Sequence, residues 1–414
     1  MSGPRWIPAM LLVTAFQVIS FAQVIFTDDG TNMAVAMVMI IFLAVEWVYA
    51  IFSSIIHRKN GMALECIAFF LSGIGLAISA AQGTSLMITQ FIAILLGMGV
   101  FIGLLWIISD VERADKFILP AEIFAIVLLA LGLVISMVLG AINGAYNWIK
   151  IGGFSFQPSE IVKIPFVFVG AASLEKIQST KSIKHYVAFA VLCIGLLFLE
   201  KDLGTALIFF VAFLVLAFMR SGDVRTIIFI VVAAAMLAAM VVLVRSDYVM
   251  NRFSTYRHIW DDPYGSGFQQ THALTYAVSG GLAGMGLGGG YLRNLSAATE
   301  DLIFGVVCEE LGLLIGFLVA ACYLLIFVHA IRNSKGSTSA FYSIATCAAG
   351  ALILFQASMN IFGVSDFLPF TGVTLPFVSR GGSSMISCWG MLAFIKAADN
   401  RTWAKGKKGG LKKV

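Results

Sequence analysis

Long apolar stretches recur along the whole chain and are separated by short polar segments. Most contain about 20 mainly apolar residues, the length a helix needs to cross a hydrocarbon core of ~30 Å. Beta barrels would instead show short segments of alternating polarity. The pattern therefore predicts an all-α polytopic membrane protein with about twelve transmembrane helices. The predicted spans are Ile7–Phe26, Met33–Ile56, Met62–Ala81, Ser85–Ile108, Phe117–Leu139, Pro158–Leu174, Tyr186–Leu199, Leu203–Met219, Thr226–Val244, Leu302–Ile331, Thr338–Phe362 and Pro376–Ala397.

Composition agrees with a membrane location. Hydrophobic residues make up 60% of the chain and charged residues 12%, against roughly 45–50% and 25% in soluble domains. No small-residue cleavage site follows the first span before Asp28, so we expect that span to be retained as an anchor. The six cysteines lie in or beside apolar spans without paired spacing, which predicts neither disulfides nor a metal cluster. We find no signal for nucleic-acid binding.

Basic residues in alternate loops predict the orientation, because Lys and Arg are retained on the cytoplasmic side during insertion. The net charge of +5 comes largely from the C-terminal tail, where six Lys or Arg would be drawn to anionic lipid headgroups. Both termini are predicted to be cytoplasmic, with a large extracytoplasmic loop around residues 246–300. Lys150 and the residues after Arg245 depart from the alternation, which suggests a functional task for their cations.

Three predicted outer segments are longer and more polar than topology requires: Gly140–Gln157, Ser246–Glu300 and Gly363–Leu375. We expect function to be concentrated in them. The glycine-dense part of the second segment resembles a phosphate loop only superficially, because the strand–loop–helix context and the Gly-Lys-Ser/Thr ending are missing. A nucleotide-binding site is therefore rejected.

Several charged or aromatic residues near these segments have both a structural and a functional reading. Trp148 is typical of an aromatic belt, and Lys163 has a ready partner in Glu160 on the same helix face. Asp202 is well placed as a helix N-cap. Glu309 and Glu310 lie about two turns into a predicted span and are functional candidates by default.

Five dispersed blocks together resemble the SEDS family (shape, elongation, division and sporulation), the FtsW/RodA/SpoVE group of peptidoglycan polymerases. The blocks are Gly144-Ala145 with Trp148; Phe156-Gln157-Pro158-Ser159-Glu160 with Lys163; Lys201-Asp202-Leu203-Gly204-Thr205-Ala206; Asp301-Leu302-Ile303-Phe304 with Glu309-Glu310-Leu311-Gly312; and Thr371-Gly372 through Leu375-Pro376-Phe377 to Gly381-Gly382-Ser383-Ser384. The likeness covers roughly Leu139 to Ala397. Members usually have three spans before the tryptophan loop, whereas five precede Trp148 here. The resemblance thus implies an additional N-terminal transmembrane hairpin at 1–60, a glycosyltransferase core at 61–400 and a basic cytoplasmic tail at 401–414.

The resemblance implies an inverting glycosyltransferase in the cytoplasmic (inner) membrane that polymerises lipid II, with a class B penicillin-binding protein as partner. Asp301 would be the general base. Lys163, Arg252, Arg257 and Arg380 are candidates for holding the pyrophosphate. Glu309 or Glu310 would tune the base or help hold a divalent cation, Mg²⁺ or Mn²⁺, at a position that spacing does not fix. The remaining substrate-binding candidates are Trp148, Glu160, Gln269, Gly381, Gly382, Ser383 and Ser384; no organic cofactor is expected.

The chain departs from the family's sequence pattern at two places, and two rival functions remain possible readings of the sequence. Many members have Pro-Glu-Ala-His-Thr-Asp where this chain has Ser296-Ala297-Ala298-Thr299-Glu300-Asp301, and Arg380 stands where tyrosine is frequent. A lipid II flippase would also explain buried carboxylates and broken helices, although inverted repeats are not apparent. A non-enzymatic scaffold for a cell-wall synthase would leave Lys163, Glu309, Glu310 and Arg380 unexplained. Elongation, division and sporulation would require the same chemistry.

Overall fold

A computed structural model describes residues 6–27, 30–56, 61–140, 145–151, 154–175, 180–225, 228, 230–232, 255–337 and 339–399. The predicted span 226–244 lies largely outside these residues, and Arg252 and the tail 401–414 lie wholly outside them. Two short antiparallel hairpins accompany the helices. They are β1 (Phe26–Thr27) with β2 (Gly30–Thr31), and β3 (Ile149–Ile151) with β4 (Phe154–Phe156).

The fold is otherwise helical, as predicted. The helices are α1 (Ile7–Ile25), α2 (Met33–Ile56), α3 (Ala63–Gln82), α4 (Thr84–Ile108), α5 (Val111–Leu139), α6 (Pro158–Glu175), α7 (Thr180–Leu199), α8 (Leu203–Ser221), α11 (Phe268–Ser279), α12 (Ile303–Leu311), α13 (Leu313–Lys335), α14 (Ala340–Val364) and α15 (Gly382–Ala397), with a short 3₁₀ turn η1 (Leu292–Asn294). Helix α5 begins six residues before the predicted span at Phe117, because the Asp110 carboxylate caps it by accepting the Glu112 N–H at 3.0 Å.

Within the described residues, eight helices are long and apolar enough to cross a membrane; the count of about twelve spans stays a prediction. These eight are α1, α2, α3, α4, α5, α8, α13 and α14. The predicted span 302–331 is wrong as a single helix, because the chain breaks at Gly312 between α12 and α13. Gly312 has φ +88°, and a Cβ there would lie 2.3 Å from the Leu282 carbonyl oxygen. Only glycine fits that turn without strain.

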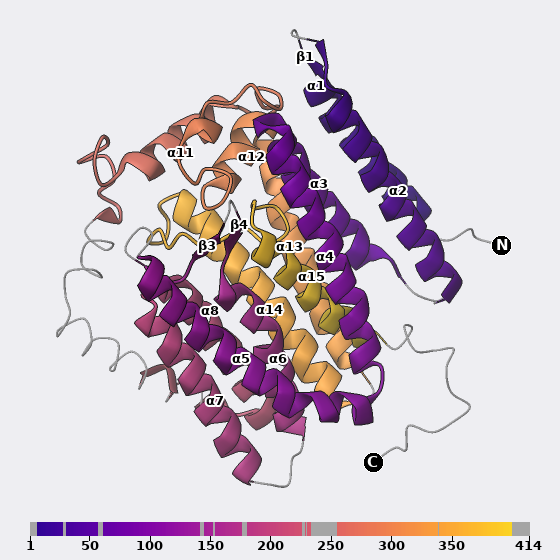
Figure 1. The fold of residues 1–414 in the computed structure, drawn as a ribbon, viewed down its shortest axis with the longest axis vertical. Coiled ribbons are helices and arrows are strands. Elements are labelled where there is room, and N and C mark those ends of the chain that lie inside the picture. Colours follow the sequence, from indigo (N-terminus) through magenta and orange to yellow (C-terminus); the bar gives the residue numbers. More distant parts are fainter. Residues whose placement is uncertain are drawn as a thin grey trace.

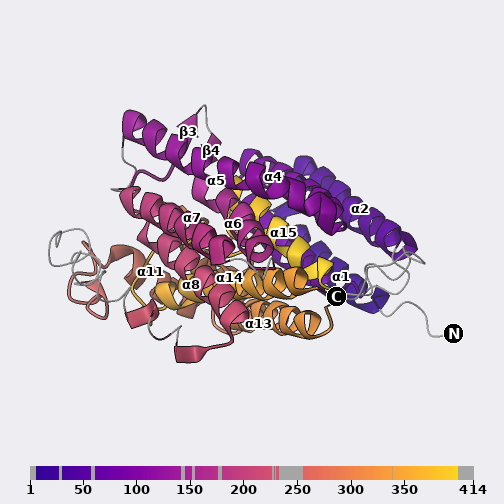
Figure 2. The same ribbon diagram turned by 90° about the horizontal axis from the view of Figure 1, so that it is seen from below.

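Helix α15 lies in the middle of the bundle and packs against α4, α14 and α6 (Figures 1 and 2). It starts at Gly382 rather than at the predicted Pro376, so the preceding residues form a non-helical turn near the site described below. Trp389 on α15 is completely buried, and its ring packs against Phe69, Phe101 and Phe377. The core therefore holds the middle of α15 against α3 and α4.

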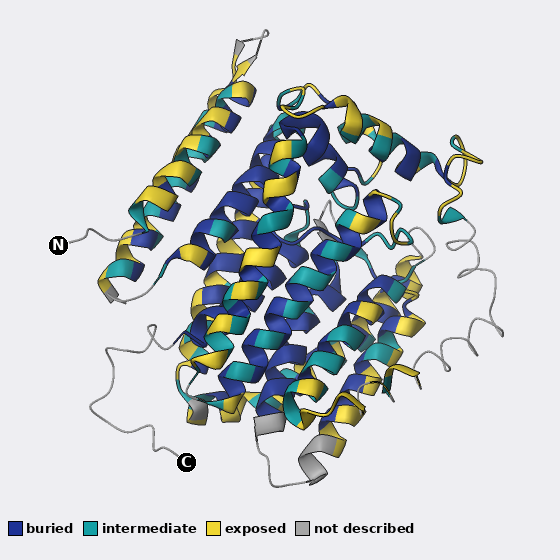
Figure 3. Ribbon diagram, turned by 180° about the vertical axis from the view of Figure 1, so that it is seen from behind, coloured by how far each residue is buried: buried dark blue, intermediate teal, exposed yellow. Residues whose placement is uncertain are grey.

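The first two helices form a pair at one edge of the bundle, with exposed apolar outer faces (Figures 1 and 3). Helix α1 packs on α3, and α2 on α4. Inside the pair, the buried Gln17 side chain donates to Glu46 Oε1 at 2.9 Å and to the Phe69 carbonyl at 3.2 Å. At the end of α1, Gln23 Oε1 accepts the Leu287 N–H at 2.8 Å. Hydrogen bonds at two positions along α1 thus connect the helix pair to the rest of the bundle.

Candidate active site

The three polar segments expected to carry function meet around one cavity of about 650 Å³. The first segment contributes Ala145, Asn147, Trp148 and Gln157; the second Thr255, Tyr256, Ser266, Gln269, Gln270, Ser296 and Ala297; the third Phe370, Thr371, Gly372, Val373 and Thr374. Asp301, Glu160 of α6, and Lys201, Asp202, Leu203 and Thr205 at the start of α8 complete the wall. Four predicted site residues therefore line one space: Trp148, Glu160, Gln269 and Asp301.

Backbone contacts hold Asp301 in the wall. Its N–H donates to the Ala297 carbonyl at 2.9 Å, and its carbonyl accepts from Asn360 Nδ2 at 2.8 Å. Ala297 has φ 60°, an uncommon conformation for a residue with a side chain, which turns the chain just before the aspartate. Gly372, with φ +68°, lies against the Asp301 carboxylate, since a Cβ there would be 3.3 Å from Oδ2.

Replacing Gly372 with alanine should therefore lower the free energy of unfolding by about 1–2 kcal/mol, the cost of a left-handed conformation for an L-residue. Thermal unfolding of the purified chain in detergent would measure it. Gly103→Ala in α4 is the matched control, because nothing lies within 4 Å of a Cβ at that position. Equal melting temperatures for Gly372→Ala and the wild type would contradict the expectation that an alanine at this position strains the backbone.

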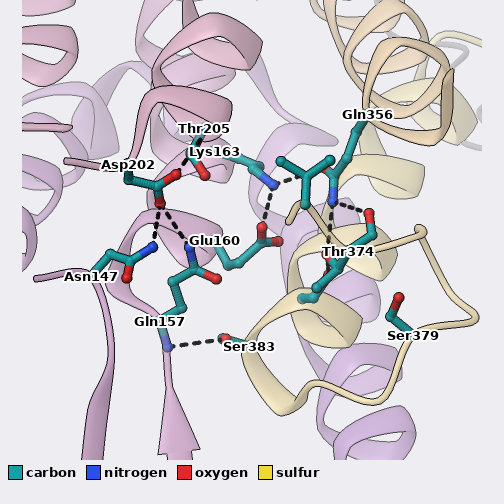
Figure 4. Close-up of polar contacts among 12 residues, drawn as sticks. Asn147, Gln157, Glu160, Lys163, Asp202, Thr205, Gln356, Thr374, Ser379 and Ser383 are labelled. Carbon is teal, nitrogen blue, oxygen red and sulfur yellow. Dashed lines mark hydrogen bonds and ion pairs between the residues drawn. The ribbon is translucent and has the colours of Figure 1, made fainter. Parts of the chain in front are cut away.

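A polar network joins the first segment to α8 (Figure 4). Asp202 Oδ2 accepts from Asn147 Nδ2 and Gln157 Nε2, both at 2.9 Å, while Oδ1 accepts the Thr205 N–H at 3.0 Å. The predicted N-cap role of Asp202 is confirmed, and the same carboxylate also fixes two cavity-lining amides. Lys201 beside it has φ 61° and lines the cavity, with its ammonium 5.5 Å from the Tyr146 ring centroid.

A second network runs behind the cavity, from α6 to α14 (Figure 4). Lys163 Nζ donates to Glu160 Oε1 at 2.6 Å and to Gln356 Oε1 at 2.8 Å, and Gln356 Nε2 donates to Thr374 Oγ1 at 2.9 Å. The predicted pairing of Glu160 with Lys163 is confirmed. Lys163 is 1% exposed and is not part of the cavity wall, so its ammonium lies behind Glu160 rather than facing the space.

Glu200, in the turn before α8, is a buried carboxyl beside this wall. Burial, and secondarily the Asp202 charge, raise its pKa from the ordinary 4.5 to about 8. Between pH 4.5 and 8 the folded chain thus retains a proton that the unfolded chain has lost. Stability should fall as pH rises through that window, by at most about 1.4 kcal/mol per pH unit.

Glu200→Gln removes this ionisation, so its melting temperature should exceed that of the wild type by a margin that grows from pH 5 to pH 8. Melting curves of both proteins across that range test the expectation. Glu112→Gln, at an exposed position near the start of α5, is the control and should show no growing margin. A constant difference between Glu200→Gln and wild type would contradict the raised pKa.

Glu309 and Glu310 lie elsewhere, in α12. Glu309 accepts the N–H groups of Tyr291 and Leu292 at 2.7 and 3.0 Å, and Glu310 accepts that of Gly288 at 3.1 Å. Their carboxylates therefore hold the glycine-rich chain that leads into η1. Neither is part of the Asp301 cavity wall. A substrate contact for either residue stays a prediction.

The final motif is divided between supporting contacts and a second space. Ser383 Oγ accepts the Gln157 N–H at 3.2 Å, and Ser384 Oγ lies 2.7 Å from Thr374 Oγ1. The Gly381 N–H donates to Gln90 at 3.4 Å, and Gly382 begins α15. Arg380 pairs with Glu300 at 2.8 Å and lines a separate cavity.

Of the two cations predicted in the long loop, Arg257 does not line the Asp301 cavity. Arg257 is exposed, and its backbone N–H donates to Asp366 Oδ1 at 3.2 Å. Its neighbours Thr255 and Tyr256, rather than Arg257 itself, form part of the wall. Arg252 falls outside the described residues. Substrate contacts for both arginines stay predictions.

The described part of the chain contains no ready-made site for a divalent cation. No group of three or more His, Cys, Asp or Glu side chains there could hold a metal ion. Of the carboxylates in the wall, Asp202 is engaged by two amides and an N–H, and Glu160 by Lys163. The residues present therefore do not form a prearranged metal centre.

Sequence reasoning passed over two amides of α14. Gln356 and Asn360 are spaced i,i+4, and both are buried. Gln356 holds Lys163 and Thr374, and Asn360 holds the carbonyls of Asp301 and Val373 at 2.8 and 2.7 Å. The sequence signal for them was two amide side chains in an otherwise apolar stretch. Their i,i+4 spacing puts both on one face of the helix.

Known proteins resemble this chain in sequence and in fold. The family model FTSW_RODA_SPOVE, described as "Cell cycle protein", matches residues 61–402, so the α1–α2 pair lies before the match. A probable peptidoglycan glycosyltransferase FtsW of Borreliella burgdorferi is 33% identical, over 66% of this chain and 78% of that one. Stage V sporulation protein E of Bacillus subtilis is 33% identical, over 59% and 68%.

Solved structures agree in fold. A structure titled "Structural coordination of polymerization and crosslinking by a peptidoglycan synthase complex" matches with a TM-score of 0.67 and 22% identity, over 81% of this chain and 96% of that one. The rod shape determining protein RodA of Thermus thermophilus matches with a TM-score of 0.59 and 23% identity, over 81% and 95%. The family model covers most of the chain, and each of the five sequence blocks contributes at least one residue to the wall of one cavity; the chain belongs to the FtsW/RodA/SpoVE family.

Proposed function

We propose that this protein is a peptidoglycan glycosyltransferase that polymerises lipid II at the outer face of the cytoplasmic membrane. The observation that supports it best is the cavity of about 650 Å³ in which three polar segments surround Asp301. The relatives named above as glycosyltransferases are consistent with this chemistry. In this proposal the cavity end of the bundle faces outward and both chain termini are cytoplasmic.

The reaction is a displacement at the anomeric carbon of one lipid-linked sugar. The 4-hydroxyl of the acceptor sugar attacks that carbon, a new C1–O bond forms, and the bond from C1 to the pyrophosphate oxygen breaks with inversion. Asp301 accepts the proton of the attacking hydroxyl, a role that contributes roughly 10²- to 10⁴-fold when the geometry is right. The left-handed turn at Ala297 and the Asn360 contact keep its backbone fixed while this happens.

The other wall residues orient the substrate and compensate charge. Asn147 and Gln157 are held by Asp202 and present fixed amides, and Trp148 offers a ring on which a sugar can stack. Lys201 is the cation of the wall and is placed to attract the departing pyrophosphate. A Mg²⁺ or Mn²⁺ requirement remains a proposal, and no step here passes through a metal. The proposed partner is a class B penicillin-binding protein, in keeping with the synthase complex whose fold matches.

The decisive experiment gives the purified chain lipid II in nanodiscs, with and without a class B penicillin-binding protein, and separates the products by glycan length. We expect polymer from the wild type. A parallel assay in sealed vesicles measures whether lipid II changes leaflet. Transport without polymer would replace the proposal with a flippase, and neither activity would favour a scaffold.

A further inference from the structure

The end of helix α1 contacts the chain that leads to Asp301. Gln23, in the last turn of α1, accepts the Leu287 N–H at 2.8 Å through its side-chain Oε1. This end of α1 lies at the same end of the bundle as α11 and α12 (Figure 1). The family model begins at residue 61. A residue that precedes the family match therefore binds the backbone of a segment that continues to the proposed base.

The chain around Leu287 turns tightly beside α12. Gly286 and Gly288 have φ +89° and +84°, a conformation that glycine adopts without strain. The N–H groups of both glycines bind Glu310 of α12: that of Gly286 donates to its carbonyl at 2.9 Å, and that of Gly288 to its carboxylate at 3.1 Å. The Leu287 N–H between them donates to Gln23 instead. Helix α1 thus completes the hydrogen bonding of a turn that α12 holds on both sides.

Helix α3, on which α1 packs, holds the same chain further along. Arg293 Nη1 donates to the Ala81 carbonyl at 2.9 Å, and Gln82 Nε2 donates to the Arg293 carbonyl at 3.1 Å. Thr299 Oγ1 then donates to Gln82 Oε1 at 3.2 Å, two positions before Asp301. The ends of α1 and α3 therefore hold this chain at three successive points before the proposed base.

The height of α1 relative to the core is fixed separately from Gln23. The buried Gln17 side chain donates to Glu46 of α2 and to the Phe69 carbonyl of α3. It lies about 9 Å before Gln23 along the helix axis, at 1.5 Å per residue. The Gln23 side chain is itself exposed. Replacing it should therefore remove the contact with Leu287 and leave the packing of α1 unchanged.

We propose that Gln23 is a positioning residue for glycan polymerisation: by holding the Leu287 N–H, it keeps the chain from Leu287 to Asp301 on the course that places Asp301 in the cavity wall. This inference rests on the proposed function, because it concerns the placement of the proposed general base. A displaced base slows the proton transfer more than it weakens substrate binding. The additional hairpin α1–α2 thereby has a task within its own chain.

The kinetic test compares variants of the full chain in nanodiscs supplied with lipid II. In Gln23→Leu, kcat should fall by about threefold to tenfold, the effect of one lost hydrogen bond, while KM stays within about twofold of the wild type. Gln23→Glu keeps an oxygen acceptor at the same distance from the backbone and should retain the wild-type rate. Thr89→Val is the matched control, because it removes an exposed hydroxyl that donates to the Ser85 carbonyl of its own helix, α4.

Amide hydrogen exchange of the same proteins measures the contact directly. The peptide that contains Leu287 should exchange about threefold faster or more in Gln23→Leu, and at the wild-type rate in Gln23→Glu and Thr89→Val. All four proteins should melt at the same temperature. Unchanged exchange in Gln23→Leu would overturn the proposal, as would faster exchange with an unchanged kcat, or a rise in KM alone.

Exchange also separates this inference from the proposed function. A wild-type chain that makes no polymer would refute the proposed function, and the positioning role with it. Faster exchange in Gln23→Leu would even then show that α1 holds the Leu287 N–H. If the wild type polymerises and the kinetic and exchange effects of Gln23→Leu are both absent, the proposed function stands and only the role of Gln23 is lost.

Discussion

Asparagine at position 301 should lower the rate of glycan polymerisation by about 10²- to 10⁴-fold, because an amide cannot take the proton of the attacking hydroxyl. The change is nearly isosteric. The contacts of Asp301 with Ala297 and Asn360 are made by its backbone atoms, so asparagine keeps them. Initial rates of polymer formation from lipid II, measured on gels, give the effect.

Asp261→Asn is the matched control, since Asp261 is an exposed carboxylate of the same predicted outer loop that pairs with His258. It should polymerise at the wild-type rate. Melting temperatures of both variants should equal that of the wild type. Full-rate polymerisation by Asp301→Asn would remove Asp301 as the base and leave the cavity without an assigned proton acceptor.

Lys163→Met should destabilise the protein by about 3–5 kcal/mol, the usual result of leaving one buried charge without its partner. Glu160 is 3% exposed and Lys163 1%, and their 2.6 Å contact is supported from α14 by Gln356. Removing the ammonium leaves the buried Glu160 carboxylate without its ionic partner and also frees Gln356 Oε1. Thermal or denaturant unfolding in detergent measures the loss.

The double variant Glu160→Gln/Lys163→Met should regain most of that stability, because no uncompensated charge remains. Lys116→Met, at an exposed position in the first turns of α5, should change stability by less than about 0.5 kcal/mol. If Lys163→Met unfolded at the wild-type temperature, the pair would have to be hydrated rather than buried. The activity of the stable double variant then reports whether the Lys163 charge is needed for catalysis.

Much of the fold could be predicted from hydropathy, because a membrane helix must satisfy its backbone within one continuous apolar segment. Helices α1, α2 and α4 end within a residue or so of their predicted bounds. The break at Gly312 could not be predicted in this way, since apolar residues continue on both sides and only the left-handed φ of the glycine interrupts the helix.

The site was predictable to the extent that its residues are unusual for their surroundings. Asp301, Glu160 and Trp148 stood out as polar or aromatic residues in outer segments, and they do line one cavity. The depth of each residue relative to the cavity depends on contacts between helices far apart in the chain. Lys163 meets Gln356 across 193 positions, so its place behind Glu160 had no local signal.

The Gln17–Glu46 contact has a consequence for biosynthesis. Helices α1 and α2 leave the ribosome before α3, and each carries a buried polar side chain that hydrocarbon solvates poorly. Because the two side chains bond to each other, the pair can enter the bilayer without waiting for α3. Lys163 is likewise matched early by Glu160 on its own helix, whereas Glu65 of α3 meets Lys396 only when α15 has been made. During insertion, the polar pairs between neighbouring segments can therefore form first. The Glu65–Lys396 pair, which joins distant segments, forms later.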